Sequence, residues 1–229
     1  MTVVTGARKG IGRALAEHYC KRGHAVVGVS RSASDLSLEN YEHVECDVAD
    51  EKRIQQLIAH VRESHGKIDH LINNAGVASM NHTLTTPAAT VTKSVSTNLL
   101  GTFLFCREVA KLMSRRRYGR IVNFSSVAVP LALEGEAVYA ATKAAVETLS
   151  RVLAKELAPF QITVNTVGPC PLDTDLIRSV PKEKIDKVLE RQAFRELCTL
   201  DSVFGVIDFF LDPRSRLVTG QTIYLGGVW

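Results

Sequence analysis

The chain has 229 residues, of which 45% are apolar and 23% charged, enough to build the core of one α/β domain. Its net charge of +4 is too small to indicate nucleic-acid binding without a concentrated basic patch. The apolar runs are shorter than the roughly 20 residues of a membrane span, and we expect neither a membrane anchor nor a secretory segment. Five dispersed cysteines without a C-x-x-C pair predict no metal site and a reduced, cytoplasmic protein.

The first thirty residues have the pattern strand, glycine turn, helix, strand. Met1–Thr5 is an apolar run, helical apolar spacing extends from Ile11 to Gly23, and residues 24–30 resemble a buried strand. Between them lies G-x-x-x-G-x-G, whose glycines would let the backbone approach a pyrophosphate at a helix N-terminus. A merely tight turn is the alternative. We expect a nucleotide to contact the turn at Gly6, Arg8, Lys9, Gly10, Ile11 and Gly12.

Arg31 directly follows the second strand, where a site for NAD usually presents a carboxylate to the ribose 2′-hydroxyl. A cation at this position suits a 2′-phosphate instead, and Lys9 adds another cation at the neighbouring turn. The alternative is that both are solvated surface cations. The pattern favours NADP(H) over NAD(H).

The rest of the chain alternates strands and helices. We expect strands at 41–48, 68–72, 121–124, 162–167 and 221–225, and helices at 50–66, 90–117, 139–158 and 202–211. Residues 31–46 are too short and polar for a full crossover helix. The segment 170–197 combines a Pro-rich loop with a charged amphipathic stretch and is the expected substrate loop.

This alternation predicts one α/β domain over residues 1–229. Its architecture would be a single Rossmann-type, doubly wound parallel sheet of about seven strands, flanked by helices on both faces. Ligands of such sheets bind beyond the carboxyl ends of the strands. The turns at Gly6, Asn73–Gly76, Ser126 and Pro169 should therefore converge on one crevice.

Tyr139 and Lys143 are four residues apart on a predicted helix, so their side chains share a face. An ammonium group beside a phenol lowers the pKa of the phenol, and the pair could then transfer a proton. The spacing alone also occurs often by chance.

Five motifs, taken together and in their order along the chain, resemble the pattern of the short-chain dehydrogenase/reductase family, and the resemblance covers nearly the whole chain. Ser126 lies 13 residues before Tyr139, as the family pattern expects. The motifs are Thr5-Gly6-x-x-x-Gly10-x-Gly12, Asn73-Asn74-Ala75-Gly76, Asn98, Ser126 and Tyr139-x-x-x-Lys143.

The resemblance implies a role for each residue. Tyr139 would be the general acid in carbonyl reduction and the base in the reverse reaction, and Lys143 would lower its pKa and bind the nicotinamide ribose. Ser126 would hydrogen-bond the substrate oxygen, and Asn98 would hold a water of a proton relay. A strand-end hydroxyl and an amide that bridges backbone groups are the plainer alternatives for Ser126 and Asn98. Further cofactor contacts are implied at Asp47, Val48, Asn74, Ala75, Gly76, Tyr139, Lys143, Pro169, Leu172 and Thr174.

The stretch Arg115–Arg120 is similar to that of 3-oxoacyl-acyl carrier protein reductases, in which a residue matching Arg117 docks the carrier. Their second docking arginine would fall at Phe160, and a solvated helix end is the alternative. The implied activity is NADPH-dependent reduction of a 3-oxoacyl thioester, carrier-bound or free, or of a related carbonyl. Oxidation of a cyclic alcohol or dihydrodiol with NAD(P), and a catalytically silent NADP(H) sensor or scaffold, are the alternatives.

The resemblance also implies a homotetramer or homodimer built on helices 90–117 and 138–158. One departure from the family is Cys170, which stands where glycine is usual. It is expected to be either a small apolar filler or a reactive thiol near the nicotinamide.

Overall fold

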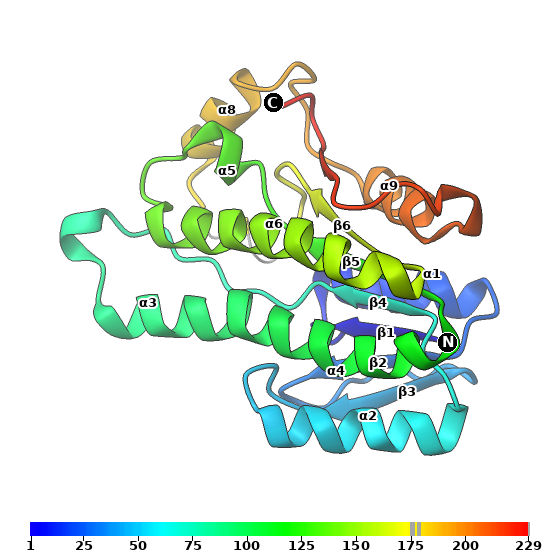
Figure 1. Ribbon diagram of the computed structural model, residues 1–229. Helices are drawn as coiled ribbons and strands as arrows, with labels where there is room; N and C mark the ends of the chain where they lie inside the picture. The colour runs from blue at the N-terminus through cyan, green and yellow to red at the C-terminus, as the bar shows by residue number, and fades with distance from the viewer. Residues whose placement is uncertain (175–176, 178–179, 229) are drawn as a thin grey trace.

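One parallel sheet forms the centre of the computed structural model, which describes residues 1–174, 177 and 180–228. Within this part of the chain, seven strands pair in the order β3-β2-β1-β4-β5-β6-β7, with helices on both faces (Figure 1). This confirms the predicted doubly wound, Rossmann-type sheet. The strands are β1 Thr2–Thr5, β2 Val26–Ser30, β3 Tyr41–Glu45, β4 His70–Asn73, β5 Gly119–Phe124, β6 Ile162–Gly168 and β7 Thr222–Tyr224.

The sheet separates two apolar cores because successive side chains of a strand point to opposite faces. Val3 and Leu71 pack toward α2, α4 and α6, whereas their neighbours Val4 and Ile72 pack toward α1 and α9. The helices that build these layers are α1 Gly10–Lys21, α2 Glu51–His65, α4 Gly101–Arg116, α6 Ala137–Leu157 and α9 Leu200–Leu211.

Shorter segments connect these elements. They are α3 Ala88–Ser94, α5 Ala128–Leu131 and α8 Lys182–Glu190, the π-helical turn η2 Val95–Leu100, and the 3-10 turns η1 Thr83–Thr85, η3 Ala158–Phe160 and η4 Pro213–Ser215. Residues 31–40, all described, contain no helix, as the short polar connection predicts. No helix in the described part of the chain is long and apolar enough to cross a membrane.

The predicted strand 41–48 is too long, since β3 ends at Glu45. Cys46 still donates its backbone N–H to Ser30 O (2.8 Å), the last residue of β2, after which the chain turns. The carboxylate of Asp47 accepts from Ala49 N (3.0 Å) and stabilises that turn. Asp50 then caps α2 by accepting from Arg53 N, as its position predicts.

The predicted helix 90–117 is continuous in direction but not in hydrogen bonding. It begins at Ala88, widens into the π-helical turn at Val95–Leu100, and continues as α4. Such turns occur frequently at functional sites, and this one contains Asn98. The amphipathic stretch 181–197 is helical only over Lys182–Glu190.

Candidate active site

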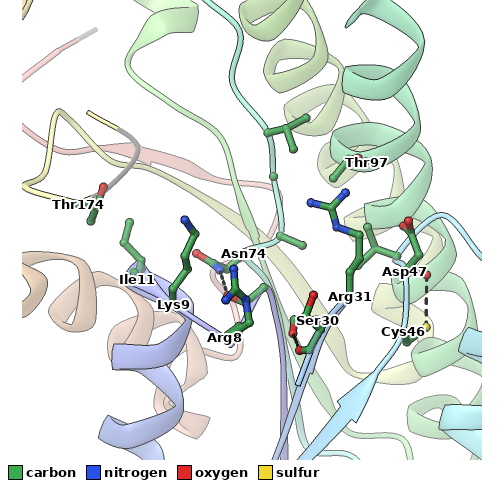
Figure 2. A pocket seen from close by; sticks show the side chains of 17 residues that line it. Arg8, Lys9, Ile11, Ser30, Arg31, Cys46, Asp47, Asn74, Thr97 and Thr174 are labelled. Carbon is green, nitrogen blue, oxygen red and sulfur yellow. Dashed lines mark hydrogen bonds between the residues drawn. The ribbon is translucent and has the colours of Figure 1, made fainter. Parts of the chain in front are cut away.

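The carboxyl ends of β1, β2 and β4 surround one open cavity of about 290 Å³ (Figure 2). Because all strands are parallel, the turns that follow them meet at this edge of the sheet. The cavity brings together these residues predicted from the sequence: Gly6, Arg8, Lys9, Gly10, Ile11, Arg31, Asp47, Val48, Asn74, Ala75, Gly76 and Thr174.

Other lining residues were not predicted: Ser30, Ser32, Cys46, Val77 and Thr97. Each of them is adjacent in the sequence to a predicted site residue, and this adjacency could have been used to predict them. Among the described residues predicted to contact the cofactor, Gly12, Tyr139, Lys143, Pro169 and Leu172 do not line this cavity.

Gly12 supports the cavity by allowing α1 to begin against the turn after β1. A Cβ atom on Gly12 would lie 2.2 Å from Gly6 O and 2.4 Å from Nδ2 of Asn74. Gly6 has a φ of +72°, which favours glycine, and Asn74 Nδ2 donates to Thr5 O at 3.0 Å. The N-terminus of α1, with its unpaired N–H groups, is thereby held at the cavity, where it favours an anion.

Cations surround the part of the cavity near β1 and β2. Figure 2 shows Arg8 and Lys9 on the turn after β1 and Arg31 after β2. Within the described residues, the guanidinium of Arg31 makes no hydrogen bond or ion pair. The nearest acid along the chain, Asp35, is bound by Arg13. This part of the cavity therefore presents three cations, as a phosphate requires, although the carboxylate of Asp47 also lines the cavity.

Lys143 lies in α6 with only 4% of its surface exposed. Its Nζ donates to Phe124 O (2.8 Å) at the end of β5 and lies 5.8 Å from the ring centroid of Tyr139. Burial disfavours the ammonium form and lowers the pKa of Lys143 to about 8.

Tyr139 is partly buried one helical turn before Lys143. Burial raises the pKa of Tyr139 to about 12, while its hydrogen bond with Ser126 acts in the opposite direction and the charge of Glu136 adds to the rise. Lys143 is not among the groups that shift this pKa in the protein alone, so the expected lowering by Lys143 stays a prediction. Tyr139 is protonated at neutral pH, the state that a proton donor needs.

Asn98 is fully buried, and its side chain connects two elements. Oδ1 accepts from Val77 N (2.8 Å), and Nδ2 donates to Val77 O (2.9 Å) and to Oγ1 of Thr142 (3.0 Å). Thr142 in turn donates to Tyr139 O (2.8 Å), a contact that sequence reasoning missed. The side chain of Asn98 thus bridges backbone groups, and a water on Asn98 stays a prediction.

Gly76 lies between the cavity and the side chains of Lys143 and Asn98. A Cβ atom on Gly76 would lie 3.4 Å from Nζ of Lys143 and 3.5 Å from Oδ1 of Asn98. A molecule that follows the cavity from Arg31 to Gly76 therefore arrives beside Lys143.

Ser126 and the start of the substrate loop lie on the neighbouring strand ends. Ser126 Oγ accepts from Ala128 N (3.2 Å), and Pro169 O accepts from Val127 N (3.3 Å). Leu172 is only 6% exposed, so its side chain packs in the core and does not face the cavity. Cys170 is also buried, and a hydrogen bond with Cys198 together with burial raises the pKa of its thiol, which suits the role of a filler.

A buried carboxylate lies one turn beyond Lys143. Glu147 accepts hydrogen bonds from Ser125 Oγ (2.5 Å) and from the hydroxyl of Tyr224 in β7. These contacts fasten the peptide before Ser126 to α6, and nothing in the sequence pattern indicated them. The described part of the chain holds no cluster of His, Cys, Asp and Glu that could bind a metal ion.

A family model described as enoyl-(acyl carrier protein) reductase matches residues 6–227. The chain belongs to the short-chain dehydrogenase/reductase family. This confirms the resemblance drawn from the motifs and places the chain in an oxidoreductase family.

Known members of this family are similar over nearly their full length. The 3-oxoacyl-[acyl-carrier-protein] reductase FabG of Escherichia coli is 30% identical, covering 99% of this chain and 96% of the relative. A putative gluconate dehydrogenase from Agrobacterium tumefaciens has a TM-score of 0.91 at 29% identity, covering 99% of this chain and 94% of its own. The structure of ElxO with NADP bound has a TM-score of 0.89 at 27% identity, covering 98% and 96%.

Proposed function

We propose that the protein is an NADPH-dependent reductase that transfers hydride to a ketone, in a 3-oxoacyl thioester or a related carbonyl compound. One observation carries the proposal: the cavity runs from the cation Arg31 to Gly76, where an added Cβ would lie 3.4 Å from Nζ of Lys143, one turn from a protonated Tyr139. The similarity to FabG supports the substrate class, and the similarity to ElxO with NADP bound supports the cofactor.

The residues of the cavity fit a phosphorylated dinucleotide. Arg31 and Arg8 offer charge to a 2′-phosphate, and the N-terminus of α1 with its glycine turn offers N–H groups to a pyrophosphate. Asp47 and Val48 would contact the adenine, and Thr174, whose Oγ1 donates to Leu172 O (3.2 Å), lies where a carboxamide could bind.

The bound nicotinamide would supply the hydride. Ser126 and Tyr139 donate hydrogen bonds to the substrate oxygen, on which negative charge develops during reduction. Tyr139 then gives its proton to that oxygen. Lys143 keeps further N–H donors besides the one to Phe124 O, so it can bind a ribose hydroxyl beside Gly76 and favour the resulting phenolate.

A docked carrier protein is harder to reconcile with one copy of the chain. Arg117 follows the last residue of α4 and precedes β5, which begins at Gly119, whereas the cavity lies at the opposite ends of the strands. The six residues of β5 separate these edges by about 20 Å. We therefore rest the proposal on the thioester itself, whose reduction does not need Arg117.

Alcohol oxidation is the second candidate, and the similarity to a putative gluconate dehydrogenase favours it. It requires Tyr139 as a base, a role in which the pKa of Tyr139 must fall below its raised value in the protein alone. A silent NADP(H) sensor would not need the Tyr139–Lys143 pair that this chain retains. For all three, we propose a cytoplasmic location, since the five cysteines are free and buried.

A paired assay tests the proposal. Oxidation of NADPH and of NADH would be followed with the same panel of 3-oxoacyl thioesters, quinones and cyclic ketones. We expect turnover of a ketone that is faster with NADPH. Equal or faster turnover with NADH would contradict the cofactor assignment, and binding of NADPH without any turnover would favour the silent alternative.

A further inference from the structure

The turn after β2 forms one wall of the cavity, and a histidine lies behind it. Ser30, Arg31 and Ser32 line the cavity, and Arg31 and Ser32 are exposed. The turn contains no glycine or proline that would fix its backbone conformation. Ser30 Oγ donates to Ser32 O at 2.6 Å and closes the turn. His43 of β3 adds contacts to both ends of it: its Nε2 lies 2.9 Å from Ser30 Oγ and 3.0 Å from Ser32 O.

The partners of His43 determine which nitrogen carries its proton. Ser32 O is a carbonyl and can only accept, so Nε2 must be the donor. Nδ1 is then the acceptor, and it lies 2.6 Å from the hydroxyl of Tyr41, which can donate. The neutral imidazole satisfies all of these contacts at once, and its orientation is fixed from both sides.

Tyr41 is itself held in place by β2. The two residues lie on the same face of β3, and His43 pairs with Gly28 in the neighbouring strand. A Cβ atom on Gly28 would lie 2.2 Å from the hydroxyl oxygen of Tyr41, so the phenol occupies space that only a glycine leaves open. A chain of contacts thus runs from Gly28 through Tyr41 and His43 to the turn that carries Arg31.

We propose that His43 is a positioning residue that holds the Ser30–Ser32 turn in the form that accepts the adenosine 2′-phosphate. His43 does not line the cavity, so it acts through the turn. A fixed turn presents the guanidinium of Arg31, the hydroxyl of Ser32 and the N–H groups of the turn together, which lowers the entropy cost of binding a phosphate. The inference rests on the proposed use of NADP(H) and deepens it by naming what supports selection of that cofactor.

The test measures, by isothermal titration calorimetry on the full chain, the binding of two fragments of the cofactor. Adenosine 2′,5′-bisphosphate carries the 2′-phosphate and 5′-AMP lacks it, so the ratio of their dissociation constants isolates recognition of that group. We expect the native chain to prefer the bisphosphate. His43→Ala should reduce this preference about tenfold, equivalent to two ordinary hydrogen bonds, with 5′-AMP affinity nearly unchanged.

Two further variants separate positioning from general damage. His43→Gln keeps a donor near the place of Nε2 and should retain most of the preference, while Tyr41→Phe keeps the ring over Gly28 and should lose about threefold of it. The matched control is His60→Ala, whose imidazole contacts Glu42 (2.7 Å) from α2 and does not touch the turn; it should retain the native ratio.

The possible failures are distinguishable. A native chain without preference for the bisphosphate would overturn the NADP(H) assignment and this inference with it. A native preference that His43→Ala leaves intact, or an equal loss for both ligands, would overturn the inference alone.

Discussion

Lys143 places an amine in the interior of the protein, where the proposed reaction uses it but where it costs stability. Its pKa falls from 10.5 to about 8 on folding, so the unfolded chain binds more protons than the native chain between those values. Stability should therefore rise with pH from about 8 to 10.5. Below pH 8 the penalty is complete and amounts to about 3 kcal/mol.

Replacing Lys143 by Met should therefore stabilise the protein at neutral pH while abolishing activity. The gain is about 2 kcal/mol at pH 7, because the loss of the hydrogen bond to Phe124 O offsets about 1 kcal/mol of the penalty. By pH 10 the native lysine is neutral and the advantage should shrink by about 2 kcal/mol. Urea unfolding of both proteins at the two pH values measures this; a Met variant that is less stable at pH 7, or a pH-independent difference, would refute it.

At the scale of single residues, the sequence was informative where a motif dictates the residue type. Arg31 and Gly76 are such positions, and both line the cavity. Residues whose partners lie in distant elements could not be predicted. Thr142 accepts a hydrogen bond from Asn98, and Glu147 accepts one from Ser125. The raised pKa of Tyr139 could not be predicted from the sequence either, because it depends on burial, which only the fold determines.

At the scale of elements, the contact between α1 and the turn after β1 defines the cavity. Gly12→Ala would push a methyl group into the backbone at Gly6 O, which cannot move as a flexible side chain could. We expect a loss of about 1–3 kcal/mol in the free energy of unfolding and weaker NADPH binding.

The matched control for Gly12→Ala is Gly205→Ala in α9, where an added Cβ meets nothing within 4 Å. That helical glycine should accept alanine with a gain of about 0.5–1 kcal/mol and unchanged NADPH binding. Urea unfolding and NADPH titration of both variants give the comparison. A Gly12→Ala variant as stable as the control would show that α1 can shift without harm.

Boundaries of elements were less predictable than their existence. The period of apolar residues placed each strand of the sheet, but the end of β3 depends on hydrogen bonds to β2 and on the turn at Asp47. The π-helical turn around Asn98 has no signature in apolar spacing, because its six residues make little more than one turn and so show no complete period.

At the scale of the whole molecule, helices α4 and α6 bury one side in the core yet expose apolar residues on another. Phe103 is 37% exposed and Val152 48%, whereas Phe105 and Leu153 of the same helices are buried. Such helices are typical of contacts between subunits. We expect sedimentation to show a homodimer or homotetramer that Phe103→Asp weakens; a monomeric native chain would contradict this.

The alternation of elements made the parallel sheet predictable, and with it the convergence of Gly6 and Asn74 at one edge, whereas Ser126 and Pro169, expected in the same crevice, do not line the cavity. The same fold logic explains why Arg117 lies at the other edge, which a linear motif cannot show. The substrate is not encoded in this way, because the described loop residues 170–174 and 191–197 depend for their shape on contacts such as the one from Cys198 N to Pro171 O.

The central claim is that Tyr139 gives the proton in NADPH-dependent ketone reduction. The most direct measurement is the rate of NADPH oxidation with a 3-oxoacyl thioester for the native chain and Tyr139→Phe, with NADPH affinity measured on both. We predict that the substitution lowers the rate by at least about 100-fold while the dissociation constant of NADPH changes less than about threefold. A Tyr139→Phe variant that reduces the thioester at the native rate would contradict the account.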